Sequence, residues 1–373
     1  MENVLALEQL SPDAAVRKTA SMQDSLADRS RLHDVIVYGE QEPAGNAESQ
    51  DNPDHVLLET PHGEIRFTSP IINAAGPRHE GISNFDDLGQ SESGAIVLKT
   101  ATLVGTSGNP EPRYSPPGEF HEGALNAMGL PNLGYEVYAE EVPRLKETYR
   151  KPVFASISGK KPGDNATMIR RFTEKGVDAI EINGSCQNIH RNGPMLANDP
   201  VALARELHEC REATDKPLGV KLPAYADAHY FEAIAAVLLE GEVDFITAIN
   251  TVGPSLKVDY QVARTAMAAM SGYGGLSGEP IRPIAIANVH KLYELIGETI
   301  PIIGVGGISQ GWHALEHFEA GASVAALATA FMEEGARVFE RIWRELLTEI
   351  DGRSVEEIRG SLAVHPEEAV PAS

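Results

Sequence analysis

The sequence predicts a (β/α)₈ barrel, and three observations support this fold class. Short apolar runs rich in Val, Ile and Ala recur eight times, and a longer amphipathic segment follows most of them. Continuous apolar runs are typical of parallel strands buried on both faces, with helices as the crossovers. Eight such units in about 270 residues match the size of a closed barrel. A doubly wound sheet remains the alternative, because periodicity does not reveal whether a sheet closes.

The elements follow one another in a regular order along the chain. The expected strands are residues 71–75, 95–100, 153–157, 179–183, 218–222, 245–250, 302–307 and 325–330. The expected helices lie near residues 135–149, 164–176, 200–214, 228–240, 283–297, 311–320 and 333–350. In such a barrel the functional groups lie at the carboxyl ends of the strands and in the loops that follow them.

The two ends of the chain differ from this pattern. Residues 1–60 form an acidic extension, which we expect to be partly helical or disordered, with one helix beginning near Ser11 and Pro12. Residues 40–54 read as a polar linker. The barrel is expected over residues 61–360, and residues 361–373 form a tail.

Charge and composition exclude several classes of protein. The 373 residues carry 31 Lys and Arg against 54 Asp and Glu, a net charge of −23. Nucleic acids and anionic membranes are therefore not expected partners. No apolar stretch approaches the roughly 18–20 residues of a membrane span, and the first residues do not resemble a secretory signal. Two cysteines without a CxxC motif fit a reducing, cytoplasmic compartment.

Two lysines interrupt apolar runs at equivalent places. Lys99 ends the second expected strand and Lys221 lies in the fifth. Burying an ammonium group without a partner is costly, so the alternative is that each side chain extends to water from a frayed strand end. Two lysines at matching positions instead favour a bound anion or an electron-rich ring.

The last two strands end in residues suited to a phosphate. Gly304, Gly306 and Gly307 end the seventh strand, and Thr329 follows the eighth. Backbone N–H groups of glycine turns and helix starts bind phosphate, and barrels place phosphate at these two loops. The glycines alone would equally fit simple turns, but their position favours a phosphorylated cofactor.

The fourth strand runs into a polar loop with a thiol. Asn183, Ser185, Cys186 and Asn188 are close together in the sequence EINGSCQN. A lone cysteine is more often a small buried apolar residue, and Cys210, in a helical pattern, fits that description. Cys186 has polar neighbours and is expected above the barrel mouth.

Asparagines also collect at that mouth. Four are expected to face it, namely Asn126, Asn183, Asn188 and Asn250. Each amide offers a donor and an acceptor, so together they suit a small ring that bears several C=O and NH groups. Singly, each is more often a turn residue.

One short match points to a metal and is set aside. His313, Glu316 and His317 fit the HxxEH pattern of inverted zinc proteases, but they fall on a helix beyond its first turn and lack an evident third ligand. We expect no metal site. A Walker loop is absent, and no GxGxxG follows the first strand.

These strand-end residues resemble those of dihydroorotate dehydrogenase. The resemblance runs from about residue 71 to residue 359, through NAAG (73–76), LKTATL (98–103), GNPEPRY (108–114), NAMGLPNLGY (126–135), NGSCQN (183–188), PLGVKLPAY (217–225), INTVG (249–253), GGLSG (274–278), IIGVGGI (302–308) and LATA (327–330). The chain has cysteine at position 186, where class 2 members have serine, and it contains GLPNLGY. In both respects it resembles class 1A, whose members are dimers that use fumarate.

The resemblance implies an FMN enzyme that oxidises (S)-dihydroorotate to orotate in pyrimidine biosynthesis. It implies that Cys186 removes the C5 proton, that hydride passes from C6 to the flavin N5, and that Lys99 lies between the two. Substrate would be held by Lys99, Asn126, Met128, Gly129, Leu130, Asn183, Asn188, Asn250 and Thr251. FMN would be held by Ala75, Lys99, Thr100, Asn183, Lys221, Ile249, Gly278, Gly306, Gly307, Ala328 and Thr329. The implied partners are fumarate and a second copy of the chain.

Four positions depart from the family pattern. Gly184 and Gln187 replace the usual Leu and Pro around the Ser-Cys pair, while Thr251 stands for Ser and Ala328 for Gly. A related barrel flavoenzyme that oxidises another small ring is therefore the second hypothesis. The third is a non-catalytic barrel that binds flavin or pyrimidine as a sensor, although Cys186 and both lysines argue against it.

Overall fold

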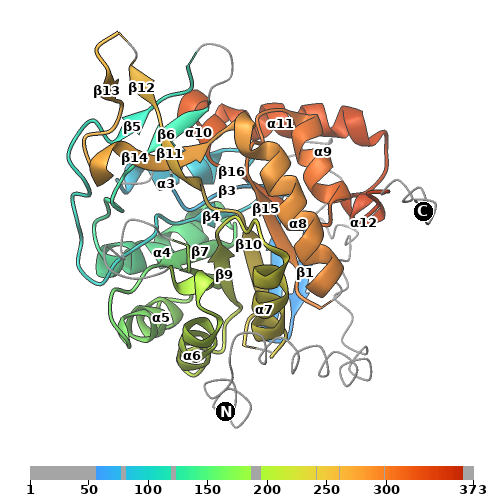
Figure 1. Ribbon diagram of the computed structural model, residues 1–373. Helices are drawn as coiled ribbons and strands as arrows, with labels where there is room; N and C mark the ends of the chain where they lie inside the picture. The colour runs from blue at the N-terminus through green and yellow to red at the C-terminus, as the bar shows by residue number, and fades with distance from the viewer. Residues whose placement is uncertain are drawn as a thin grey trace, which may run out of the picture.

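The computed structural model describes residues 56–76, 81–118, 123–185, 195–240, 242–259, 261–297 and 299–363. Within these residues eight parallel strands form a barrel surrounded by helices (Figure 1). The predicted (β/α)₈ fold is confirmed. The helix and linker expected in the N-terminal extension lie outside the described residues, and the expected domain boundaries stay a prediction.

The barrel strands follow one another around the barrel in chain order. They are β3 (Ile71–Asn73), β4 (Ile96–Val97), β7 (Val153–Ile157), β8 (Ala179–Asn183), β9 (Leu218–Leu222), β10 (Phe245–Ala248), β15 (Ile302–Val305) and β16 (Val324–Leu327). The ladder order is β3-β16-β15-β10-β9-β8-β7-β4. Several strands are shorter than expected, because their last residues leave the ladder and enter the loops of the mouth.

Helices cover the outside of the barrel (Figure 1). They are α3 (Ser83–Gln90), α4 (Tyr135–Tyr149), α5 (Asp164–Glu174), α6 (Pro200–Arg211), α7 (Ala228–Leu239), α8 (Arg282–Ile296), α9 (Gly311–Glu319), α10 (Thr329–Glu334), α11 (Arg337–Ile350) and α12 (Val355–Ile358), with 3₁₀ turns at η2 (Leu196–Asn198), η3 (Met270–Gly272) and η4 (Glu279–Ile281). The helix expected over residues 333–350 is two helices. Gly335, with a φ of 77°, ends α10 and allows the chain to turn into α11.

Side chains along each strand alternate between two apolar layers. In β8, Ile180 and Ile182 pack outward among the helices, whereas Ala179 packs inside the barrel. Glu181 has the same parity as Ala179 and is buried inside. The interior is therefore apolar at the amino ends of the strands and polar toward their carboxyl ends.

The side chain of Asn73 closes the barrel between its first two strands. Its Nδ2 donates to the carbonyl of Val97 at 2.8 Å, and its Oδ1 accepts from the Val97 N–H at 2.9 Å. Asn73 is fully buried and Val97 nearly so. The amide thus makes the pair of bonds that a neighbouring strand would otherwise supply.

A hairpin covers the amino-terminal end of the barrel. β1 (Val56–Thr60) pairs with β2 (Gly63–Phe67), so this hairpin spans residue 61. Phe67 packs on Phe154 inside the barrel, with ring centroids 5.8 Å apart, and Phe154 contacts Phe245 in turn. Apolar side chains of the hairpin and of the strands fill this end.

A small antiparallel sheet stands over the opposite end. It consists of β5 (Tyr114–Ser115), β6 (Ala124–Asn126), β11 (Val252–Leu256) and β14 (Tyr273–Ser277), in the order β11-β14-β6-β5. A second pair, β12 (Val258–Asp259) and β13 (Arg264–Thr265), projects beyond it (Figure 1). These strands belong to no predicted element, and they roof the carboxyl-terminal mouth.

In the part of the chain that the structure describes, no helix combines the length and apolar character that crossing a membrane requires.

Candidate functional site

Two joined cavities lie at the carboxyl-terminal mouth, between the barrel and the small sheet. The larger has a volume of about 510 Å³ and the smaller about 210 Å³. Six residues line both, and they are Lys221, Asn250, Thr251, Ser277, Ala328 and Thr329. The two cavities therefore adjoin one another and share one wall.

Lys99 lies on the wall of the larger cavity and does not extend to water. It is 4% exposed, and its Nζ donates to the carbonyl of Gly76 at 2.5 Å. Gly76 follows β3, the barrel neighbour of β4, so the bond ties the two loops together. The ammonium is thereby presented to the cavity from a fixed position.

Lys221 lies where the two cavities meet. On β9, Lys221 lies two residues after Gly219, which pairs with the buried Glu181 of β8. Gly219 and Lys221 are therefore on the same face of β9, the face that points into the barrel. Burial lowers the pKa of the Lys221 ammonium, and the charge of Glu181 raises it in part. The alternative that this lysine extends to bulk water does not hold, since the residue is 7% exposed.

Three asparagines bring their amides to the larger cavity. Asn126 comes from β6, Asn183 from the end of β8 and Asn250 from the loop after β10. The Nδ2 of Asn250 donates to Ser185 Oγ at 2.9 Å, and Asn126 donates to the carbonyl of Gly275 at 3.3 Å. The amides are thus oriented by protein contacts and still reach the cavity.

The loop after β6 completes this wall. Met128 and Leu130 line the larger cavity, while Gly129, with a φ of 71°, gives the turn between them. Asn132 is buried and acts within the loop, since its Oδ1 accepts from Gly134 N at 2.9 Å and its Nδ2 donates to Leu130 O at 2.8 Å. It is therefore a structural asparagine.

Cys186 and Asn188 lie outside the described residues, so their predicted roles stay predictions. The described chain reaches Ser185, which lines the larger cavity and is 3% exposed. Cys210 is buried in α6, and burial raises the pKa of its thiol strongly. This thiol is unsuited to acid–base work, as the helical pattern indicated.

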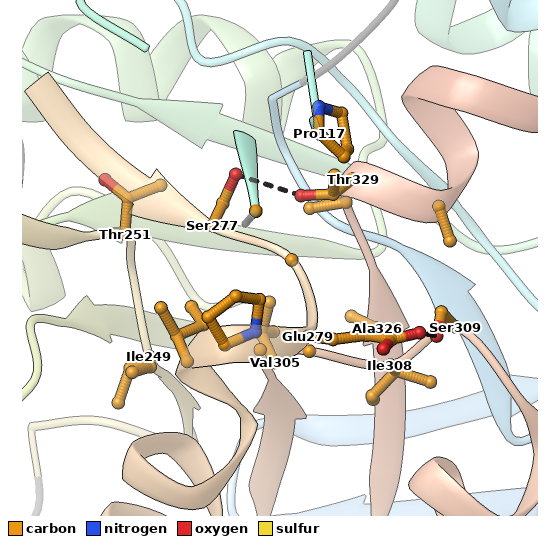
Figure 2. A pocket seen from close by; sticks show the side chains of 18 of the residues that line it. Pro117, Ile249, Thr251, Ser277, Glu279, Val305, Ile308, Ser309, Ala326 and Thr329 are labelled. Carbon is orange, nitrogen blue, oxygen red and sulfur yellow. Dashed lines mark hydrogen bonds between the residues drawn. The ribbon is translucent and has the colours of Figure 1, made fainter. Parts of the chain in front are cut away.

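The smaller cavity is lined by glycines and by a pair of hydroxyl groups, Ser277 and Thr329, whose hydrogen bond is shown in Figure 2. Gly278, Gly306 and Gly307 line it, all with positive φ, and Ile249 forms part of its apolar wall. The hydroxyl of Thr329, at the first residue of α10, donates to Ser277 Oγ at 2.9 Å. Ala328 also lines the cavity.

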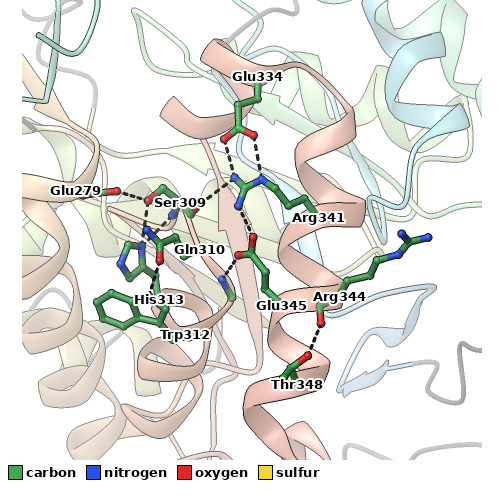
Figure 3. Close-up of polar contacts among 11 residues, drawn as sticks. Glu279, Ser309, Gln310, Trp312, His313, Glu334, Arg341, Arg344, Glu345 and Thr348 are labelled. Carbon is green, nitrogen blue, oxygen red and sulfur yellow. Dashed lines mark hydrogen bonds and ion pairs between the residues drawn. The ribbon is translucent and has the colours of Figure 1, made fainter. Parts of the chain in front are cut away.

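Carboxylates near this cavity are all engaged elsewhere. Glu279 accepts from Ser309 Oγ at 2.5 Å, and Glu333 accepts from Tyr114 at 2.5 Å. Glu334 pairs with Arg341 at 2.6 Å, and Arg341 also donates to the carbonyl of Ser309 (Figure 3). The carboxylates therefore brace the loop, and backbone groups and hydroxyls remain to meet a ligand.

The HxxEH residues support the same loop from behind. His317 is fully buried, and its Nε2 lies 3.0 Å from the carbonyl of Gly306. Ser309 N–H donates to His313 Nδ1, while Glu316 pairs with Arg282. Burial lowers the pKa of both histidines to about 4. They act as neutral hydrogen-bonding groups at neutral pH.

Thr100 and several residues of the small sheet and α10 also contribute to the mouth of the barrel. Thr100 is buried behind the wall of the larger cavity, and its hydroxyl donates to the carbonyl of Ala75, which does line it. Residues missed from the sequence come mainly from the small sheet and α10, and they are Tyr114, Met270, Tyr273, Ser277 and Met332. The motifs GNPEPRY and GGLSG contain two of them, Tyr114 and Ser277.

Comparisons with known proteins identify the family. The sequence model of the family described as "Dihydroorotate dehydrogenase" matches residues 57–350. The chain is 36% identical over 293 residues to a dihydroorotate dehydrogenase A (fumarate) of Lactococcus lactis subsp. cremoris, covering 78% of this chain and 93% of the relative.

Two relatives from eukaryotes are similar to the same extent. A dihydroorotate dehydrogenase (fumarate) of Trypanosoma cruzi is 39% identical over 303 residues, with 79% of this chain and 94% of the relative covered. That of Saccharomyces cerevisiae is 34% identical over 302 residues, with 79% and 95% covered. A match of this extent, over a barrel whose mouth carries the expected lysines and amides, means that the chain belongs to the dihydroorotate dehydrogenase family.

Proposed function

We propose that this protein oxidises dihydroorotate to orotate in pyrimidine biosynthesis, with FMN as cofactor and fumarate as electron acceptor. The observation that carries the proposal is the pair of joined cavities. One end offers amides and an ammonium to a small polar ring, and the other offers glycines and hydroxyls to a phosphate. The fumarate-type names of the relatives support the choice of acceptor.

The donor set fits FMN. A phosphate needs N–H and O–H donors, which glycine turns and Thr329 can supply, and a flavin ring needs a flat apolar-walled slot with a cation beside it. We assign FMN to Ala75, Lys99, Asn183, Lys221, Ile249, Gly278, Gly306, Gly307, Ala328 and Thr329, with Thr100 behind them. When bound at these residues, FMN would supply the hydride transfer that links oxidation of dihydroorotate to reduction of fumarate.

The protein's own part is to hold the pyrimidine and to move one proton. We assign the ring to Lys99, Asn126, Met128, Gly129, Leu130, Asn183, Asn188, Asn250 and Thr251. Cys186 serves as the base that removes the C5 proton, which is weakly acidic because a carbonyl lies beside it. A positioned base contributes about 10²–10⁴-fold to such a step. An ordinary thiol has a pKa of about 8.5, so the rate should rise with pH toward that value.

A specific observation keeps a second candidate in view. A Cβ placed on Gly184 would lie 3.1 Å from Val220 and 3.2 Å from Ala197, so a larger residue at this position would require its neighbours to shift by a few tenths of an ångström. The loop that precedes Cys186 therefore carries a smaller residue at this position than the family pattern has. A related ring could be the substrate of the same flavin site.

We also propose that the enzyme works in the cytoplasm as a homodimer. Low cysteine content and the acidic charge fit the first, and the family resemblance supports the second. Light scattering after size exclusion should give a mass of twice 40.1 kDa. A mass equal to that of one chain, at micromolar concentration, would contradict the dimer.

The test of the function uses the purified full chain. The protein should absorb at flavin wavelengths and release FMN on denaturation. Without oxygen, dihydroorotate should bleach the flavin and fumarate should restore its colour. Bound FMN that dihydroorotate leaves oxidised would favour the second candidate. A protein that binds no flavin, even when FMN is added, would refute the proposal.

A further inference from the structure

A buried carboxylate lies beneath Lys221 and belongs to neither cavity. Glu181 is 5% exposed, on the inward face of β8, one strand away from Lys221 on β9. The residues that line the cavities do not include it. An isolated carboxylate inside a barrel is unfavourable, so its presence calls for partners.

Two hydroxyl groups hold this carboxylate in place. Ser156 Oγ donates to Glu181 Oε1 at 3.1 Å, and Thr247 Oγ1 donates to Oε2 at 2.7 Å. Each carboxylate oxygen thus accepts one hydrogen bond. Ser156 lies on β7 and Thr247 on β10, which are the strands on either side of the β8–β9 pair. An ionised carboxylate only accepts hydrogen bonds, so this arrangement fits the charged form.

Lys221, unlike Glu181, lies at the cavities and is not held by hydrogen bonds in the described part of the chain. The burial of Lys221 lowers its pKa, and Glu181 is the charged group that opposes this shift. The other ionisable side chains along the cavities are Lys99, Tyr114, Tyr273, Glu279, Glu333 and Glu334.

We propose that Glu181 is a positioning residue which keeps Lys221 positively charged at the junction of the two cavities, where that charge faces the bound flavin. The inference rests on the proposed flavin site. Reduction places negative charge on a flavin, and a fixed cation beside it makes reduction easier. Glu181 therefore acts on the flavin through Lys221, without touching it.

The direct test measures the amine of Lys221 in cofactor-free protein. Acetic anhydride, which is small enough for the larger cavity, acetylates only the uncharged amine, and mass spectrometry follows the Lys221 peptide against pH. In Glu181→Gln the pH of half-maximal labelling should fall by about one unit or more, a tenfold rise in reactivity at a fixed pH. Lys291, half-exposed on α8, serves as the internal reference and should not change.

A matched variant separates charge from structure. Thr247→Val removes one hydrogen bond of the same carboxylate but leaves its charge, so Lys221 should label as in the wild type. Equal shifts in Thr247→Val and Glu181→Gln would mean that packing, and not charge, matters. An unchanged labelling profile in Glu181→Gln would overturn the proposal.

The second measurement uses the flavin-loaded enzyme. The reduction potential of Glu181→Gln should show a break with pH in the neutral range that the wild type lacks, and adding Lys221→Met should remove it. A labelling shift without a break in the pH dependence of the reduction potential would refute the proposal that Lys221 faces the flavin. Loss of flavin binding in the wild type would instead refute the proposed function, and the labelling result would still decide the charge pairing.

Folding provides a third readout if Glu181→Gln is unstable. Glu181 and Lys221 are two buried opposite charges on neighbouring strands, and removing one leaves the other without its nearby countercharge, whereas removing both does not. The double variant Glu181→Gln/Lys221→Met should then be more stable than Glu181→Gln alone. Equal instability of the two would contradict the pairing.

Discussion

Replacement of Asn73 by alanine should weaken the whole barrel. Asn73→Ala removes both bonds to Val97 and leaves the buried N–H and C=O of that residue without partners. Each unsatisfied buried group costs about 1–3 kcal/mol, so the free energy of unfolding should fall by about 2–6 kcal/mol. For a domain of this size 1 kcal/mol corresponds to roughly 2 °C in Tm, which gives a loss of about 4–12 °C.

The assay is urea unfolding followed by tryptophan fluorescence at saturating FMN, with calorimetry for Tm. Asn109→Ala is the control, because its amide makes one bond, to the carbonyl of Ala127, at a half-buried loop position. That variant should lose no more than about 1.5 kcal/mol. A loss below about 1 kcal/mol in Asn73→Ala, or one equal to that of the control, would show that the amide does not close the barrel.

Three further predictions concern chemistry, cofactor binding and pH. Cys186→Ser should keep FMN but slow flavin reduction by dihydroorotate by about 10²–10⁴-fold near neutral pH in stopped flow, with part of the loss recovered at high pH, whereas Cys210→Ser should be unaffected. Gly307→Ala should lose FMN on gel filtration, because its φ of 76° disfavours a side chain and a Cβ would lie 2.4 Å from that of Arg282. The pKa of His317 is about 4 in the fold against 6.5 in the unfolded chain, so its neutral form contributes stability above pH 6.5 that is lost as pH falls toward 4. We expect a loss of about 3 kcal/mol over that window in urea titrations, and a shallower slope in His317→Gln.

The barrel was predictable because its strands are apolar on both faces. β7, β8 and β9 have the bounds that the sequence indicated, since Val, Ile and Leu in these runs have no other place to be buried. The strand ends were less predictable. Ala75 and Asn250 continue the sequence pattern of the strands that precede them, but they lie beyond the hydrogen-bonded ladder. They line the larger cavity instead, and the pattern does not reveal this change.

The small sheet could not be predicted from local pattern. Asn126 on β6 pairs with Gly275 on β14, far apart in the chain, and β5 has only two residues. Strands of this length carry no periodicity of their own, so only long-range pairing reveals them. The hairpin at the other end does carry a local signal, since buried Ile65 and Phe67 alternate with exposed Glu64 and Arg66.

The β1–β2 hairpin decides how reactants pass through the enzyme. Because it blocks one end of the barrel, the described part of the chain leaves the mouth under the small sheet as the route to the cavities. We expect fumarate to bind in the same cavity as dihydroorotate, so orotate has to leave before fumarate binds. Steady-state rates should then follow ping-pong kinetics, with parallel lines in double-reciprocal plots, and orotate should compete with fumarate. The β1–β2 hairpin thereby affects the kinetics from the opposite end of the barrel, because it leaves one entrance for both substrates.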